Sequence, residues 1–231
     1  MSSKKIYIIF SICFVILIAL IMIQNNKLEN LIKQESIEKT RQIQRLDAAI
    51  DFSTKKSKFL MVSRDIIKKH NRSITDDEAY SIAEFNLYVC EKYNLNPVLL
   101  LALQRQESNF SVKAKSDSGA MGLCQIMPFT GRWMCDVKNI QYFENMLYDY
   151  KVNIDFAATY LSYLKSEFNN LDHVLMSYNW GPHRVYRYRI SKNKKMPEET
   201  RKYVIAIKKF YRRFNEELVG YLPVSVNHQV L

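Results

Sequence analysis

An uncharged apolar run at residues 6–23 is the feature that most limits how this chain can fold. The hydrocarbon core of a bilayer is roughly 30 Å thick, and a helix needs about 20 residues to cross it. The run has 18 residues and reaches that length with its flanks. Lys4 and Lys5 precede it, and positive charge there keeps the N-terminus in the cytoplasm. The sequence therefore predicts a cytoplasmic tail at residues 1–5 and one transmembrane helix.

A cleaved signal peptide is the alternative interpretation of this run. Signal peptides have an apolar core of about 7–15 residues and small residues at the cleavage site. Here the run ends in Ile21, Met22 and Ile23, and Ile12 precedes Cys13 where a lipid-attachment site would have a small residue. We predict an uncleaved anchor in the inner membrane. Both interpretations export the body of the chain, to the periplasm or outside.

The polar residues 24–72 are expected to form a spacer, helical at least in part. Their apolar positions are scattered and do not form the sustained heptads of a coiled coil. Ordered structure is expected from residue 73, with a folded domain at 73–222 and a C-terminal tail at 223–231.

The domain is predicted to be mainly α. With only five Gly and five Pro, the chain has few helix breakers. A capping-box pattern at residues 75–78 and the pair Asn96-Pro97 are typical of helix starts. The second helix is expected to run to about Phe110. Further helices are expected at residues 153–166, 171–179 and 199–218, with turns around Gly119–Gly122 and Gly131.

Charge and cysteine content exclude some functions. The net charge of +11 is spread along the chain, and export makes nucleic acid an improbable partner, so we expect none. Solvated helix faces explain most of the charge, and attraction to an anionic wall polymer or to lipid headgroups is the weaker alternative. No Cys/His spacing suits a metal, and no metal or cofactor is expected. Cys124 and Cys135 could form a disulfide, but buried free thiols are at least as compatible with the sequence.

Glu107 is the most informative polar residue. Leu99 and Leu103 stand eight and four residues before it, so its carboxylate continues an apolar helix face. Loss of solvation favours the neutral acid and raises the pKa of such a group, which can then donate a proton to a leaving oxygen. On spacing alone, an ordinary solvated Glu at a helix end explains the position equally well.

Four sequence blocks in order decide between these interpretations. They are QESNF at 106–110, GAMGLCQIMP at 119–128, SYNWGP at 177–182 and ETRKYV at 199–204. Over about residues 75–215 the chain resembles the soluble lytic transglycosylase family of lysozyme-like glycoside hydrolases. The resemblance implies a lysozyme-like helical domain that acts on peptidoglycan glycan strands.

The resemblance also implies roles for individual residues. Glu107 corresponds to the single catalytic acid/base of the family and is followed by Ser108. The other matched positions are expected to bind the saccharide: Ser108, Ser116, Gln125, Met127, Thr130, Tyr178, Asn179, Glu199 and Tyr203. Amides, hydroxyls and tyrosine faces suit a sugar that offers hydroxyls and acetamides. For Tyr178 and Tyr203, core packing is the competing explanation.

Three positions depart from the family pattern: Cys124 replaces an apolar residue, Trp180 a small one and His183 a glycine. Trp180 puts the preferred polymer length in doubt, and His183 is expected on a surface loop.

Apart from Glu199, a groove residue in the resemblance, the four blocks supply no obvious second carboxylate. We therefore expect cleavage between N-acetylmuramic acid and N-acetylglucosamine with closure of a 1,6-anhydro ring. The alternatives are a lysozyme-like hydrolase and an anchored wall-binding or assembly protein without catalysis. A dedicated role with secretion or conjugation machinery would share the chemistry.

Overall fold

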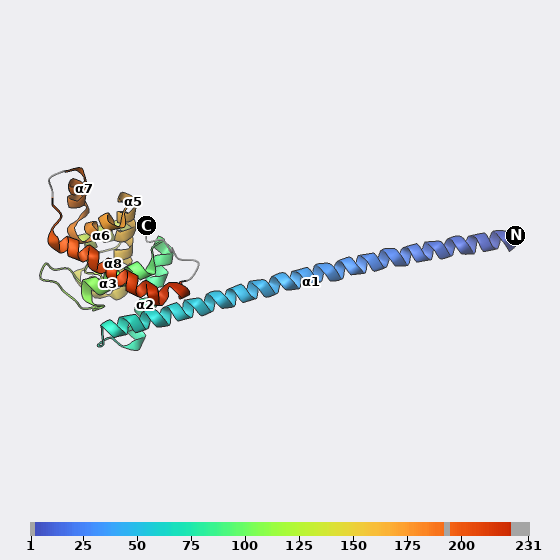
Figure 1. Ribbon diagram of the computed structural model, residues 1–231, viewed down its shortest axis with the longest axis horizontal. Coiled ribbons are helices and arrows are strands. Elements are labelled where there is room, and N and C mark those ends of the chain that lie inside the picture. The colour runs from blue at the N-terminus through green and yellow to red at the C-terminus, as the bar shows by residue number, and fades with distance from the viewer. Residues whose placement is uncertain (1–2, 192–194, 223–231) are drawn as a thin grey trace. The chain divides into compact units, whose positions relative to one another are not determined.

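The computed structural model describes residues 3–191 and 195–222, and within these ranges the chain is mainly helical (Figure 1). The predicted mainly α fold is confirmed. The described ranges contain no strand, only isolated bridges from Met121 to Lys115 and to Ile126. The expected tail at 223–231 lies outside them. The elements in chain order are α1 Ser3–His70, α2 Asp76–Tyr93, α3 Pro97–Ser108, α4 Pro128–Lys138, the 3-10 helix η1 Glu144–Tyr148, α5 Tyr150–Glu167, α6 Leu171–Trp180, α7 Pro182–Ile190, α8 Glu198–Leu218 and η2 Val219–Tyr221.

The chain divides into two compact units, Met1–Asp51 and Phe52–Leu231. The first consists of the N-terminal part of α1, and the side chains described there are exposed. It carries the apolar run. In the described part of the chain, α1 is the one helix long and apolar enough to cross a membrane. A signal sequence near an N-terminus has the same length and composition, so both interpretations of the run stay open.

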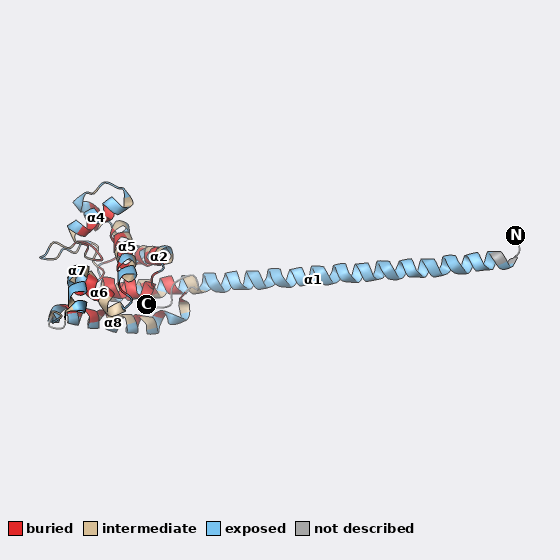
Figure 2. Ribbon diagram, turned by 90° about the horizontal axis from the view of Figure 1, so that it is seen from above, coloured by how far each residue is buried: buried red, intermediate tan, exposed pale blue. Residues whose placement is uncertain are grey.

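The second unit begins earlier than the boundary expected at residue 73. Phe59, Leu60, Ser63, Ile66 and Ile67 are all buried, whereas the long N-terminal part of α1 is exposed, drawn pale blue in Figure 2. Their spacing of three, four and seven residues puts them on one face of α1, which packs into the hydrophobic core. Residues 52–70 therefore belong to the second compact unit, together with the helices that follow them.

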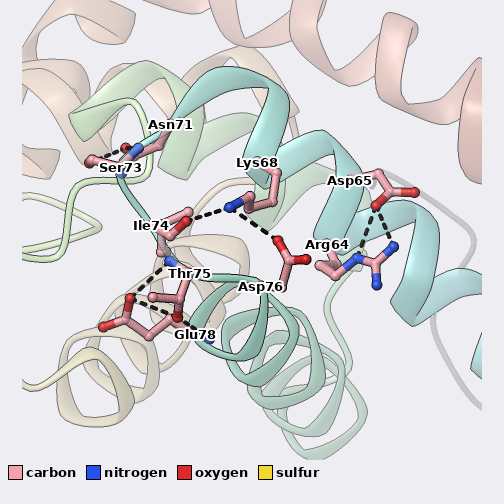
Figure 3. Close-up of polar contacts among 9 residues, drawn as sticks. All are labelled: Arg64, Asp65, Lys68, Asn71, Ser73, Ile74, Thr75, Asp76 and Glu78. Carbon is pink, nitrogen blue, oxygen red and sulfur yellow. Dashed lines mark hydrogen bonds and ion pairs between the residues drawn. The ribbon is translucent and has the colours of Figure 1, made fainter.

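Polar contacts fix the turn from α1 to α2 within this unit (Figure 3). The Nζ atom of Lys68 donates to the carbonyl of Ile74 at 2.7 Å and lies 3.0 Å from a carboxylate oxygen of Asp76. Thr75 caps α2 and forms the predicted reciprocal capping box with Glu78. The turn is thus held at both ends by side chains that satisfy exposed backbone groups.

α3 is the central helix. As predicted, it starts at Pro97, with the Asn96 side chain accepting hydrogen bonds from the first turn. Residues 97–104 are buried on every side, and the helix packs against α2 and α8. Its buried Gln104 exchanges two hydrogen bonds with Asn86 of α2, at 2.6 and 2.9 Å. The pairing gives the side-chain oxygen and nitrogen of both amides a hydrogen-bond partner inside the core.

Two helices were missed by the sequence analysis. The predicted turn at Gly131 is wrong: Gly131 lies inside α4, where a Cβ would come within 3.0 Å of Tyr142. Glycine is used here for close packing, which sequence alone cannot distinguish from a turn. The loop expected around His183 is also wrong, because that residue stands, exposed, in the first turn of α7.

Asn153 of α5 organises the long connection between α3 and α4. It is fully buried and accepts from the backbone N–H of Cys124 at 2.7 Å, while its amide donates to the carbonyls of Met121 and Leu147 at 2.9 and 2.8 Å. Gly122 lies against it with φ of 77°, and a Cβ there would come within 2.4 Å of the Asn153 amide. The connection is therefore held against α5 by one buried side chain.

Replacing Asn153 with Ala should strongly destabilise the domain. Each buried polar group left without a partner costs about 1–3 kcal/mol, so we expect the free energy of unfolding to fall by roughly 3–5 kcal/mol. Denaturant titration of the full chain in detergent micelles, followed by circular dichroism, measures this value. The exposed Asn169→Ala should change it by less than about 0.5 kcal/mol. Equal stability of the two variants would contradict the role given to Asn153.

Candidate active site

Glu107 lies in the last turn of α3, one residue before the helix ends. The helix stops because Asn109 adopts the left-handed conformation and returns its N–H to the carbonyls of Gln104 and Arg105. The apolar face that buries Leu99 and Leu103 continues to Glu107, which is only partly exposed. The carboxylate is therefore placed at the edge of the core.

Tyr203 of α8 donates a hydrogen bond to Oε1 of Glu107. Its ring is buried between α8 and the rest of the core. Burial raises the pKa of Glu107 to about 7, and the hydrogen bond from Tyr203 opposes this rise. Burial, reinforced by the nearby Glu107 charge, raises the pKa of both Tyr203 and Tyr178, which therefore stay neutral hydroxyl groups. A carboxyl group with a pKa near 7 is suited to give and to take a proton at neutral pH.

The residues of the connection after α3 are held by side-chain to backbone hydrogen bonds. The hydroxyl of Ser108 donates to the carbonyl of Leu123 at 2.7 Å and accepts from the N–H of Ser111. Tyr178 of α6 donates to the carbonyl of Cys124 at 2.9 Å. Ser116 accepts from the N–H of Ala120 at 2.9 Å and so closes the turn at residues 116–120. Ser108 and Ser116 thus have structural partners in addition to any ligand.

A cavity of about 780 Å³ runs between α4, α5 and α6. It is lined by five of the predicted saccharide-binding residues: Gln125, Met127, Thr130, Tyr178 and Asn179. The other predicted residues, Glu107, Ser108, Ser116, Glu199 and Tyr203, are not on its wall. Tyr178 links the cavity residues to those around Glu107. It lines the cavity, and the charge of Glu107 is one of the causes that raise its pKa.

The structure also places the predicted residues Asn179, Gln125 and Glu199. Asn179 accepts a hydrogen bond at 2.9 Å from Thr200 in the first turn of α8, which orients its amide at the cavity wall. Gln125 stands in the left-handed conformation with φ of 50° and donates to the carbonyl of Gly122 at 2.9 Å. Glu199, next to Thr200, is exposed. The sequence block at 177–182 in α6 therefore contacts the block at 199–204 in α8, although Asn179 and Glu199 are 20 positions apart in the chain.

The sequence analysis missed an aromatic part of the cavity wall: Phe129, Trp133, Tyr160 and Tyr163. Tyr160 and Tyr163 are in α5, a helix that was predicted but whose tyrosines were not assigned a role. Phe129 and Trp133 are in α4, which was not predicted. Their spacing of four residues was the available signal.

The cavity wall, as far as the described residues define it, contains His183 and Arg184 but no carboxylate. Within the same described residues, no cluster of His, Cys, Asp or Glu could hold a metal ion. Cys90, Cys124 and Cys135 are buried free thiols, in agreement with the second of the two states considered for them.

Glu107→Gln should stabilise the protein at alkaline pH. Because the pKa of Glu107 is raised from 4.5 to about 7 on folding, its contribution to stability is complete below pH 4.5 and is lost as the pH rises through 7. Gln stays neutral and still accepts from Tyr203. We expect the variant to be more stable than the wild type by about 2–3 kcal/mol at pH 8 and by little at pH 4.5. Denaturant titrations at several pH values measure this difference.

The matched control is Glu167→Gln, at the exposed end of α5. It should change stability by less than about 0.5 kcal/mol. A stability difference between Glu107→Gln and the wild type that does not vary with pH would mean that Glu107 titrates at its ordinary pKa.

Comparison with curated proteins finds relatives among murein transglycosylases. The chain is 39% identical over 88 residues to the soluble lytic murein transglycosylase of Escherichia coli K12, a stretch that covers 37% of this chain and 14% of the relative. It is 34% identical over 108 residues to the membrane-bound lytic murein transglycosylase C of Yersinia enterocolitica, covering 42% of this chain and 30% of the relative. The chain thus matches only a minor part of each relative's length.

Comparison with solved structures gives the same group. An inactive mutant of lytic transglycosylase Slt from Pseudomonas aeruginosa is 27% identical, with a TM-score of 0.55 over 64% of this chain and 26% of that one. The complex of a 70-kDa soluble lytic transglycosylase with bulgecin A is also 27% identical, with a TM-score of 0.50 over 60% of this chain and 26% of the other. The model of the transglycosylase SLT domain matches residues 86–201, half of the chain, which contain Glu107 and the whole cavity wall. The chain belongs to the transglycosylase SLT domain family.

Proposed function

We propose that the protein is a lytic transglycosylase that cleaves peptidoglycan, with Glu107 as its single acid/base. The observation that carries the proposal is the environment of Glu107: a carboxyl group at the core edge, hydrogen-bonded to Tyr203, with a pKa of about 7. The names of the relatives point to murein as the substrate. The cavity between α4, α5 and α6 offers amides, hydroxyls and aromatic faces, which match the uncharged groups of a glycan strand.

In the first step, protonated Glu107 gives its proton to the oxygen that links N-acetylmuramic acid to N-acetylglucosamine. The bond from C1 of the muramic acid to this oxygen breaks, and N-acetylglucosamine leaves with a free hydroxyl. The acetamide of the muramic acid can stabilise the positive charge that develops at C1, as in substrate-assisted glycosidases. A pKa near 7 leaves about half of Glu107 protonated at neutral pH.

In the second step, the Glu107 carboxylate takes the proton from the C6 hydroxyl of the same sugar. The C6 oxygen then bonds to C1 and closes the 1,6-anhydro ring. Glu107 returns to its protonated form, so no water is consumed. Tyr203 supports both steps, because its hydroxyl holds Oε1 in one position and stabilises the carboxylate between them.

Hydrolysis would require a group that activates water opposite Glu107. Inverting and most retaining glycosidases use a second carboxylate for this purpose or as nucleophile. None of the family-matched positions other than Glu107 and Glu199 carries a carboxyl group, and Glu199 is assigned to saccharide binding, which supports ring closure by the substrate's own C6 hydroxyl.

The proposal includes an anchor at residues 6–23, with the N-terminus in the cytoplasm and the SLT domain on the wall side of the membrane. The length and apolar character of this stretch of α1 support it, as does the positive charge of Lys4 and Lys5 before it. An anchored enzyme would act on strands near the membrane. Association with secretion or conjugation machinery would not alter this chemistry.

Replacing Glu107 with Gln should abolish lysis of isolated peptidoglycan. The amide keeps the size and the hydrogen bond from Tyr203 but cannot donate a proton from a carboxyl group, and general acid–base catalysis contributes roughly 10²–10⁴-fold. We expect kcat to fall by about 10³-fold or more. Turbidity loss of purified sacculi with detergent-solubilised full-length protein measures the rate. Glu167→Gln should lyse at the wild-type rate, and substantial lysis by Glu107→Gln would remove the catalytic role of Glu107.

The released fragments should end in 1,6-anhydro-N-acetylmuramic acid. Such ends have the mass of a hydrated end minus one water and are not reduced by borohydride, because the ring occupies C1. Mass spectrometry of the muropeptides before and after reduction distinguishes the two kinds of end. Reducible, hydrated ends would identify a lysozyme-like hydrolase instead, and release of no fragments would favour a wall-binding protein.

A further inference from the structure

The aromatic wall formed by Phe129, Trp133, Tyr160 and Tyr163 has no part in the chemistry proposed for Glu107. Phe129 and Trp133 come from α4, Tyr160 and Tyr163 from α5, and all four line the cavity. Aromatic side chains at helical spacing usually pack into a core. Here Phe129 is 66% exposed, Trp133 39% and Tyr163 38%, so much of this apolar surface faces solvent at the cavity.

Ring contacts hold the wall in a fixed arrangement. Trp133 meets Tyr163 edge-on with ring centroids 5.3 Å apart, and meets Tyr160 edge-on at 6.0 Å. Tyr160 and Tyr163 are nearly parallel, with 13° between their planes. Edge-to-face geometry is the favoured packing of aromatic rings, so the Trp133 ring is ordered before any ligand arrives.

The wall is continuous with the site around Glu107. Tyr160 lies 5.5 Å, centroid to centroid, from Tyr178, whose hydroxyl donates to the carbonyl of Cys124. The neighbouring carbonyl of Leu123 accepts from Ser108, the residue after Glu107. Trp133 is thus separated from Tyr178 by one ring. A glycan strand whose sugar bonds are cleaved at Glu107 can extend along the cavity over these rings.

The chemistry of the wall fits a sugar better than an apolar protein or lipid surface. Met127 and Thr130 stand beside it in the same cavity, and none of these residues is charged. A pyranose ring presents C–H groups on its face, which stack on an aromatic ring, and hydroxyls at its edge, which reach the neighbouring polar groups. Because the aromatic wall is part of the same cavity as the predicted saccharide-binding residues, we take a saccharide as its ligand.

We propose that Trp133, supported by Phe129 and Tyr163, is a saccharide-stacking subsite that lies beyond Tyr178 and gives the protein a preference for long glycan strands. The inference rests on the proposed function in that the ligand is a glycan. Trp133 binds substrate and takes no part in bond cleavage.

The test measures binding of chitotetraose and chitohexaose to the full chain in detergent micelles. Both tryptophans of the sequence, Trp133 and Trp180, line the cavity, so intrinsic fluorescence reports on occupancy directly. In Trp180→Phe, the remaining fluorescence comes from Trp133, and chitohexaose should change it more than chitotetraose does. Trp133→Ala should weaken chitohexaose binding about tenfold by calorimetry and chitotetraose binding much less, since loss of a stacking ring removes affinity for the distal sugars.

Two further variants control for folding. Trp133→Phe keeps an aromatic face and should restore most of the lost affinity. Tyr186→Ala removes a 58% exposed ring on α7 that is not on the cavity wall, and it should bind both sugars as the wild type does. On purified glycan strands, Trp133→Ala should lose more activity with long strands than with short ones.

Unchanged chitohexaose affinity in Trp133→Ala, or equal losses for the two sugars, would overturn the subsite. So would a loss of vesicle binding or self-association in this variant while sugar binding persists, because the wall would then serve a lipid or protein surface. Failure of the proposed function is seen separately, as absence of anhydro ends from wild-type protein. The fluorescence assay needs no cleavage and is read independently of that result.

Discussion

The hydrogen bond between Tyr203 and Glu107 joins residues 96 positions apart in the chain, and the site depends on the packing that allows it. α3 carries the carboxylate and α8 carries the tyrosine, and both helices bury their apolar faces against each other. The same packing removes water from Glu107 and raises its pKa to about 7. The hydrogen bond limits this rise. Two opposed effects of one helix contact thus set the proton affinity of the group on which the proposed chemistry depends.

Buried polar side chains perform the second task of shaping a loop that has no regular structure. The connection from α3 to α4 cannot satisfy its own backbone groups as a helix does, and Asn153 supplies partners from α5. Gly122 allows the close approach that these bonds require. Tyr178 and Ser108 bind the same loop at Cys124 and Leu123. The residues that matched the family motif at these positions therefore form the frame of the site as well as its surface.

Local patterns were sufficient for much of the fold. The capping box at Thr75, the start at Asn96-Pro97 and the helix that carries Glu107 follow from interactions within one or two turns, which the sequence displays directly. α4 and α7 were missed although both begin with a proline in the first turn, because a glycine stands inside α4 and directly before α7. Glycine at position 131 suggests a turn when only the sequence is considered. In the structure, its lack of a side chain allows Tyr142 and Leu147 to pack closely against α4. Residues 59–67 were assigned to a spacer. Their apolar spacing shows that one helix face could be buried, but it does not show which other helices cover that face.

The sequence by itself determined the apolar run at 6–23, the helical class of the domain and the choice of Glu107, since each rests on residue type, local spacing or an ordered set of motifs. The tertiary structure decided which matched residues meet. It brought Gln125, Thr130 and Asn179 to one cavity, placed Tyr203 on Glu107, and turned Trp133 and Tyr163 into a wall. Spacing along a chain fixes only neighbours on one element. Contacts between elements depend on how all of the apolar faces pack together, and that is settled only when the whole core forms.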